Sequence, residues 1–325
     1  MRRLLAFRTA VIALVALLSA PAAHAQGELP LVLIVGVSGG EVGARHDEVL
    51  RRTLAQAGHV EGRTVRVVSV SVESDLERLP DLARAAVARR PAVIVASGLP
   101  VVRALREATS SVPIVAMTGF WIKSRFADSL SRPGGNLTGV NIVATELDAK
   151  RLSLLSEFMP EAQRIAILRD PYVATPAHVA EMEATARELG LVLDVLDVRR
   201  PAEISAALKA AKARGAEAVN VLASPLLNGA ARHVAAAARA AGLPTICQWR
   251  EMVEAGCVLS YGPPLDEAYR LTAKQVDRVL RGARPAELPI EQPTTFELVV
   301  NKAAAAAIGL ALPPALLARA DEVIE

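Results

Sequence analysis

The stretch SLSRPGGNLTGVNIV, residues 129–143, separates two similar halves of the sequence. It opens with the turn-forming residues Pro133, Gly134, Gly135 and Asn136 and continues into a β-prone segment instead of a helix. One series of strand–helix units ends before this stretch and a second series begins after it. We therefore expect it to be an extended strand that crosses from one lobe of the protein to another.

The first half contains short, β-branched apolar runs that are typical of buried strands in a parallel sheet. They occupy residues 29–37, 64–72, 92–97 and 113–118. Apolar residues recur every three or four positions in the intervening segments, next to charged residues, which indicates amphipathic helices.

The second half repeats this alternation. Strand-like runs occupy residues 164–170, 191–198, 216–224, 244–249 and 257–262. Two consecutive series of this kind predict an α/β fold with two doubly wound parallel-sheet lobes and right-handed crossovers.

Two further segments, residues 257–265 and 284–301, also have the features of connections between lobes. Three such connections predict a three-segment hinge, with a cleft between the lobes that opens and closes. The expected N-terminal lobe comprises residues 29–139 plus 261–288. The expected C-terminal lobe comprises residues 140–260 plus 289–325.

The N-terminal segment predicts export. MRRLLAFR is basic, AVIALVALLSA is apolar, and Ala23-His24-Ala25 fits a cleavage site, so residues 1–25 are interpreted as a cleaved signal peptide. The cleavage site lacks a cysteine, and we expect no lipid anchor but a monomeric periplasmic protein. Removing Arg2, Arg3 and Arg8 leaves 34 basic residues against 34 acidic residues, which argues against binding to nucleic acid or to an anionic membrane.

The glycines of the opening stretch admit two other interpretations. A phosphate cradle requires a helix N-terminus directly after the glycines, whereas Leu137-Thr138-Gly139-Val140 intervenes here. Asn136-Leu137-Thr138 is formally a glycosylation sequon, which we interpret as a chance match.

Motifs along nearly the whole chain resemble those of the tryptophan/tyrosine-type ABC transporter substrate-binding proteins. They include AGHVEGRTVRV (57–67), ERLPDLA (77–83), ATSSVPIVA (108–116), SLSRPGGNLTGV (129–140), KRLSLLSEFMPEAQRIAIL (150–168), WREMVEAGCVLSYGP (249–263) and the segment from residue 283 to residue 325. The resemblance implies a type I periplasmic binding protein fold that holds its ligand between the lobes. It also implies delivery of that ligand to a membrane permease and an ATPase.

The sequence departs from this family at two loops. Relatives carry a Thr-Pro pair after the third strand, where this chain has Leu99-Pro100. They also carry an Asp-Pro pair after the fourth strand, where this chain has GFWIKSRF, residues 119–126. Tryptophan or tyrosine is therefore not inherited as the ligand.

Ligands of open α/β sheets bind at the carboxyl ends of the strands, which selects a small set of loops as candidates. Hydroxyls and backbone N–H groups there suit a carboxylate, and aromatic residues offer apolar walls. In the first lobe the candidate ligand-binding residues are Ser38, Gly39, Ser97, Gly98, Thr118, Phe120 and Trp121. In the second lobe and at the second crossing they are Asp170, Tyr172, Ser224, Gln248, Trp249 and Tyr261.

Each candidate also has a purely structural interpretation. Small residues make tight strand-to-helix turns, Asp170 is equally a helix N-cap, and Tyr261 is equally a hinge-packing residue. Cys247 and Cys257 lie at the end of one expected strand and the start of the next. A disulfide and two buried free thiols both remain open for this pair.

The sequence predicts a binding protein and not an enzyme. Gly36-Val37-Ser38-Gly39-Gly40 fits a nucleophile elbow, but Ser38 follows the first strand instead of a central one. The histidines 46, 59, 178 and 233 fall in or at the ends of expected helices, and no metal motif occurs, so we expect no cofactor and no metal.

The predicted function is the periplasmic solute-binding component of an ABC importer, for which amino acids and aromatic carboxylates are suitable ligands. The alternatives are an exported α/β hydrolase that uses Ser38 and a sensory ligand-binding module.

Overall fold

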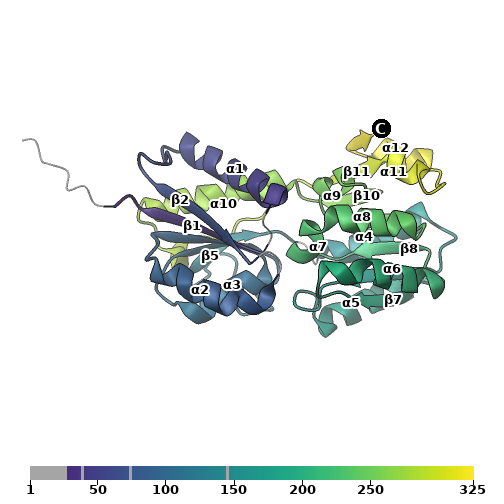
Figure 1. Cartoon of the computed structure of the whole chain (residues 1–325), viewed down its shortest axis with the longest axis horizontal. Coiled ribbons are helices and arrows are strands. Elements are labelled where there is room, and N and C mark those ends of the chain that lie inside the picture. Colours follow the sequence, from purple (N-terminus) through teal and green to yellow (C-terminus); the bar gives the residue numbers. More distant parts are fainter. Residues whose placement is uncertain (1–27, 38–39, 73–74, 144–145) are drawn as a thin grey trace, which may run out of the picture.

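The computed structural model describes residues 28–37, 40–72, 75–143 and 146–325, which form two α/β lobes side by side (Figure 1). The N-terminal lobe is built on a five-stranded sheet with the order β2-β1-β3-β4-β5, and all of its strand pairs are parallel. Its strands are β1 (Leu31–Gly36), β2 (Arg66–Ser71), β3 (Val93–Ser97), β4 (Ile114–Thr118) and β5 (Leu137–Asn141).

Helices cover both faces of this sheet. Figure 1 shows α1 and α10 together on one side and α2 and α3 on the other. Their bounds are α1 (Gly40–Gln56), α2 (Leu79–Ala88), α3 (Leu99–Ala108) and α10 (Leu265–Leu280), with short 3-10 turns η1 (Leu76–Arg78) and η3 (Pro285–Glu287). Helix α10 thus comes from the second half of the sequence and completes the first lobe.

The opening stretch of the sequence forms the edge of the first sheet. Its segment β5 pairs along its whole length with β4, so the expectation of a strand that itself crosses between lobes was wrong. Gly139 allows this pairing: it has a φ of +150°, and a Cβ there would lie 1.8 Å from the carbonyl oxygen of Ala116. Asn136 donates from Nδ2 to the carbonyl of Val112 at 2.7 Å, and Thr138 is fully buried, so both sequon residues serve the fold.

The C-terminal lobe is built on a seven-stranded sheet with the order β12-β11-β10-β9-β8-β6-β7. Strand β11 runs antiparallel to β10, because the chain re-enters this sheet from the hinge side, and β12 pairs parallel with β11. The strands are β6 (Arg164–Arg169), β7 (Val192–Asp197), β8 (Ala218–Val221), β9 (Thr245–Cys247), β10 (Leu259–Gly262), β11 (Glu297–Asn301) and β12 (Glu322–Ile324).

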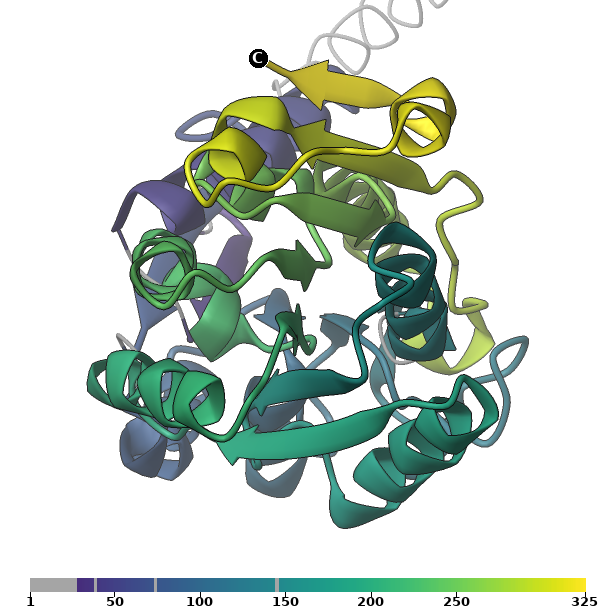
Figure 2. The ribbon, with the colours of Figure 1, turned by 90° about the vertical axis from the view of Figure 1, so that its right-hand side faces the viewer.

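The helices of the C-terminal lobe also lie on two faces. Figure 2 shows α6 and α8 on one side of the sheet and α4 and α5 on the other. The bounds are α4 (Glu146–Phe158), α5 (Pro176–Glu188), α6 (Ile204–Ala213), α7 (Pro225–Gly229), α8 (Ala231–Ala240), α9 (Arg250–Glu254), α11 (Lys302–Ala306), α12 (Pro314–Arg319) and the 3-10 turn η2 (Pro201–Glu203). In the described parts of the chain, no helix is long and apolar enough to span a membrane.

The chain passes between the two sheets three times: after β5, between β10 and α10, and between Glu291 and β11. Asn141 is the last residue paired in the first sheet, and Gly262 is the last paired residue of β10 in the second. Glu291 bridges Val140 of the first lobe. These pairings end two to three residues beyond the boundaries expected at 139, 260 and 288.

Candidate ligand-binding cleft

A cleft of about 360 Å³ lies between the two lobes, at the carboxyl ends of their strands. Both lobes contribute to its wall, together with helices α1 and α10. The described lining residues are Ile34–Val37, Gly43, Ala44, His46, Asp47, Ser69–Ser71, Val95, Ser97–Leu99, Met117–Phe120, Ile142, Val173, Ala223–Pro225, Asn228, Gln248, Trp249, Leu265 and Tyr269. Such a position is the one that parallel α/β sheets use for small ligands.

Four candidates from the first lobe line this cleft: Ser97, Gly98, Thr118 and Phe120. Gly98 lies between β3 and α3 with a φ of +90°, a conformation that favours glycine. Phe120 also has a positive φ, of 61°. The other two candidates of this lobe's first loop, Ser38 and Gly39, lie outside the described residues.

Three candidates from the second lobe, Ser224, Gln248 and Trp249, also line the cleft. Ser224 caps the N-terminus of α7, where its Oγ accepts from the backbone N–H of Leu226 at 3.1 Å. The Ser224 hydroxyl donates to Oδ2 of Asp170 at 2.8 Å, and this hydrogen bond holds the Ser224 side chain in position.

The structure places the remaining four candidates away from the cleft wall. Trp121 is buried in the core of the first lobe, and its Nε1 donates to the carbonyl of Thr118 at 2.9 Å. Asp170 is buried behind Ser224, where burial raises the pKa of its carboxyl. Tyr172 is 48% exposed at the surface, and Tyr261 stacks on Phe296 at the hinge with 6.3 Å between ring centroids.

Helices α1 and α10 supply cleft residues that were not predicted from the sequence. His46 stacks on Tyr269, with 4.7 Å between ring centroids and 9° between planes. Burial lowers the pKa of His46 to about 4, so its imidazole is neutral at neutral pH. Burial likewise raises the pKa of Tyr269 to about 12, and this side chain is hydrogen-bonded to Ser97. A signal was available, since Tyr269 is one of only three tyrosines and follows the second crossing by a few residues.

Asp47, next to His46 on α1, also lies in the cleft wall. Its Oδ2 accepts a hydrogen bond from the hydroxyl of Ser69, in the second half of β2. Burial raises the pKa of the Asp47 carboxyl, which the hydrogen bond from Ser69 opposes.

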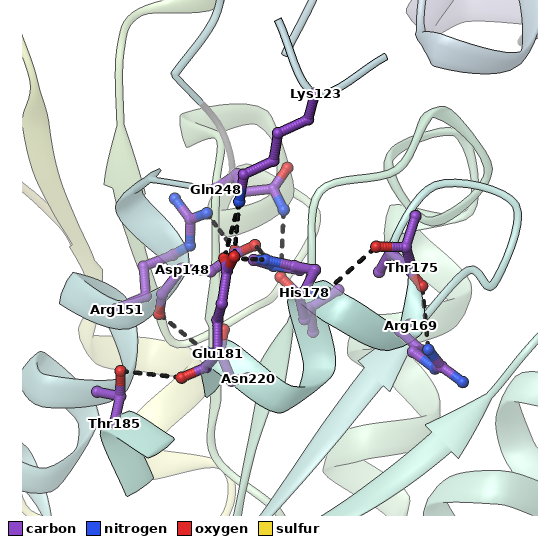
Figure 3. Close-up of polar contacts among 12 residues, drawn as sticks. Lys123, Asp148, Arg151, Arg169, Thr175, His178, Glu181, Thr185, Asn220 and Gln248 are labelled. Carbon is purple, nitrogen blue, oxygen red and sulfur yellow. Dashed lines mark hydrogen bonds and ion pairs between the residues drawn. The ribbon is translucent and has the colours of Figure 1, made fainter. Parts of the chain in front are cut away.

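The lobes touch across the cleft at several points. Phe120 packs edge-on against His178 of α5. Lys123 pairs with Glu181, one turn further along α5, at 2.7 Å (Figure 3). On the other side, Arg45 of α1 pairs with Glu254 of α9 at 3.1 Å. These contacts join the two lobes directly.

A buried charged network supports His178 from inside the second lobe (Figure 3). His178 Nε2 lies 2.7 Å from Oδ2 of Asp148, and Arg151 donates to the other carboxylate oxygen. Arg151 also donates to the carbonyl of Tyr261 at 2.8 Å, at the end of β10. The network therefore links the cleft contact at His178 to the strand that enters the second crossing.

Cys247 and Cys257 are free thiols, both fully buried. Cys247 is hydrogen-bonded to Cys257, and burial raises its pKa well above the usual range. Among the described residues, no group of histidine, cysteine and acidic side chains is arranged to hold a metal ion.

Two sheets with helices on both faces, three connections and a shared cleft define a two-lobed binding protein with the type I periplasmic binding protein fold. The chain belongs to the ABC transporter substrate binding protein family, whose model matches residues 37–324. No curated protein matches the sequence.

Solved structures share this fold. A conserved domain protein from Vibrio cholerae is 23% identical with a TM-score of 0.84, and covers 91% of this chain and 100% of its own. The ABC domain in complex with L-Trp from Streptococcus pneumonia is 22% identical with a TM-score of 0.82, at the same coverages. The ligand-free, open substrate binding protein CD0873 from Clostridium difficile is 18% identical with a TM-score of 0.63, and covers 91% and 99%.

Proposed function

We propose that this protein captures a small organic solute between its two lobes in the periplasm and presents the closed form to the permease and ATPase of an ABC importer. The observation that carries the proposal is the cleft itself, which takes its wall from the strand ends of both lobes. A solute held there contacts both lobes at once. It therefore binds the closed form more tightly than the open form and shifts the population toward closure.

The proposed ligand has an apolar body of modest size. Phe120, Trp249, Leu99 and Met117 give the wall apolar surface, while hydroxyls and amides such as Ser97 and Gln248 provide hydrogen bonds. Similar structures support capture of such solutes, since one contains L-Trp and another, 13% identical with a TM-score of 0.59, contains 5-methylthioribose. The proposed contacts include Ser97, Gly98, Thr118, Phe120, Ser224, Gln248 and Trp249, together with His46, Asp47 and Tyr269.

We further propose that residues 1–25 are a cleaved signal peptide and that the mature protein acts as a monomer without covalent chemistry. The proposed lobes are the two sheets with the helices that pack on them. Expression of the full-length chain in a Gram-negative host, followed by N-terminal sequencing of the periplasmic fraction, tests the export step. A mature chain that begins at Gln26 is expected, and retention of the full-length chain in the cytoplasm would contradict it.

A thermal-shift screen tests the binding function. The protein purified from the periplasm is screened against amino acids, aromatic amines and carboxylates, nucleosides and sugars. A ligand at 100 times its dissociation constant adds about 2.7 kcal/mol of stability, which raises Tm by several degrees. Recovery of the ligand unchanged is expected, and its conversion to product would instead favour the hydrolase that uses Ser38.

A further inference from the structure

The wall of the cleft carries very little formal charge. Its described residues include no lysine, arginine or glutamate, and Asp47 is their only aspartate. The buried His46 is neutral at neutral pH. Among the described lining residues, the formal charge is therefore negative and lies on Asp47.

Arg51, which contacts the lining residue Ser69, and Arg45, which precedes the lining residue His46, both already have acidic partners. Arg51 donates to Glu61 from Nη1 and to the Ser69 hydroxyl from Nη2 at 3.4 Å, and Arg45 is paired with Glu254. Neither arginine lines the cleft. A carboxylate or phosphate ligand would lose its hydration on entering the cleft, and no basic side chain of the described wall would compensate its charge. Such desolvation costs free energy.

Asp47 has a free acceptor in this wall. Its carboxylate accepts one side-chain hydrogen bond, from Ser69 to Oδ2, and the described residues offer no hydrogen bond to Oδ1. Burial raises the pKa of Asp47, while the hydrogen bond from Ser69 and the charge of Arg51 oppose that effect. A cation bound next to the carboxylate would oppose it further. A protonated amine supplies both the positive charge and the N–H donor that Oδ1 lacks.

The apolar part of the wall indicates the shape and polarity of the rest of the ligand. Phe120 and Trp249 face the cleft from opposite lobes, and the stacked pair of His46 and Tyr269 gives a flat, uncharged surface beside Asp47. A planar or branched apolar group fits between these side chains.

We propose that the cleft binds a small apolar amine with no net negative charge, whose ammonium group donates to Oδ1 of Asp47. This proposal rests on the proposed binding function. A carboxylate on the ligand is not required for binding.

Matched pairs of probes test this assignment by isothermal titration calorimetry at pH 7. The pairs are 2-phenylethylamine with 3-phenylpropanoate, and tryptamine with indole-3-propanoate, because the members of each pair differ mainly in charge. We expect each amine to bind at least ten-fold more tightly than its carboxylate. Asp47→Asn should weaken amine binding by about ten-fold or more, since it removes the charge but keeps the shape. Asp81→Asn, on the exposed face of α2, is the matched control and should change nothing.

Two results would overturn the assignment and leave the binding function intact. One is equal or tighter binding of the carboxylates. The other is that neither pair of probes shows binding in calorimetry while the thermal-shift screen finds an uncharged or anionic ligand. Silence in both experiments would instead overturn the binding function as well. Equal loss of amine binding in Asp81→Asn would show that the effect of Asp47→Asn is not local to the cleft.

Discussion

The ring of Phe120 stands edge-on to the ring of His178, with 6.0 Å between their centroids and 90° between their planes. Phe120 follows β4 in the first lobe and His178 belongs to α5 in the second, so this contact joins the two lobes. Behind it, Asp148 is hydrogen-bonded to His178, and Arg151 donates both to Asp148 and to the carbonyl of Tyr261. The cleft contact and the hinge strand thus share one buried network.

Loss of the Phe120 ring should favour the open form. An edge-on aromatic pair contributes about 1 kcal/mol, so Phe120→Ala should lower the closed-to-open ratio several-fold. Small-angle X-ray scattering without ligand is expected to report a larger radius of gyration for this variant. Ile122→Ala, two residues further on and 49% exposed, should scatter like the wild type. An unchanged radius for Phe120→Ala would contradict a role in closure.

Asp148→Asn should destabilise the second lobe strongly. Asp148 and Arg151 are both buried, and Asp148→Asn removes the negative charge of the ion pair that joins them. Breaking a buried ion pair in this way costs about 3–5 kcal/mol. Chemical denaturation monitors the loss, and Glu157→Gln, which breaks the exposed pair with Arg319, should cost less than 1 kcal/mol. Similar losses for the two variants would argue against the buried network as a source of stability.

His46 predicts a loss of stability as the pH falls. Its pKa is lowered by burial to about 4 from 6.5, while Asp266 raises it and Arg45 lowers it further. Well above pH 6.5 the imidazole is neutral in both the folded and the unfolded state. Between pH 6.5 and 4 the unfolded chain binds a proton that the folded protein excludes, so folding loses on the order of 3 kcal/mol. His46→Phe keeps the stack on Tyr269 and should lose less stability over this range in urea titrations. Identical pH dependence in both proteins would refute the assignment.

Gly98→Ala should weaken ligand binding by obstructing closure. A Cβ on Gly98 would lie 2.5 Å from Cγ of Pro225 in the opposite lobe, and the φ of +90° adds backbone strain. Gly58→Ala is the control for strain alone, because Gly58 has a φ of +96° with nothing within 4 Å. Isothermal titration calorimetry with the ligand that binds the wild-type protein should show a weaker affinity for Gly98→Ala and an unchanged affinity for Gly58→Ala. Equal affinities would mean that the lobes accommodate the extra methyl group.

Gly139→Ala should prevent β5 from pairing with β4. The added Cβ would lie 1.8 Å from the carbonyl oxygen and 2.6 Å from the nitrogen of Ala116. The backbone of β4 is buried and has no space to move, so a loss of several kcal/mol and a large drop in Tm are expected. Gly135→Ala, in the preceding turn and open to solvent, should be much milder. A Tm within a degree of the wild type for Gly139→Ala would contradict this account of the edge strand.

Most of the fold could be predicted from the sequence, because buried parallel strands and amphipathic helices leave periodic patterns. The runs at 92–97 and 113–118 became β3 and β4, with bounds that differ by one residue. The pairing of β5 could not be predicted, since it depends on the approach of Gly139 to Ala116 across the sheet. The direction of β11 follows from the path of the hinge, which local sequence does not encode.

The candidate site was predicted less completely than the fold. Loop residues such as Ser97, Gly98 and Ser224 follow from the rule that ligands bind at strand ends. Asp47 and Tyr269 lie within helices, and which helical face meets the cleft depends on how α1 and α10 pack together. Trp121 was expected in the cleft wall because of its loop position, but its indole N–H instead bonds to backbone in the core.

The burial of Cys247 and Cys257 has a practical consequence for measurements of the motion between the lobes. They are the only cysteines in the sequence, and maleimides react with accessible thiolates, so both side chains should stay unlabelled in the native protein. One new cysteine on each lobe would then accept a donor and an acceptor fluorophore without removal of the native pair. Energy transfer in single molecules would report each opening and closing event as it happens.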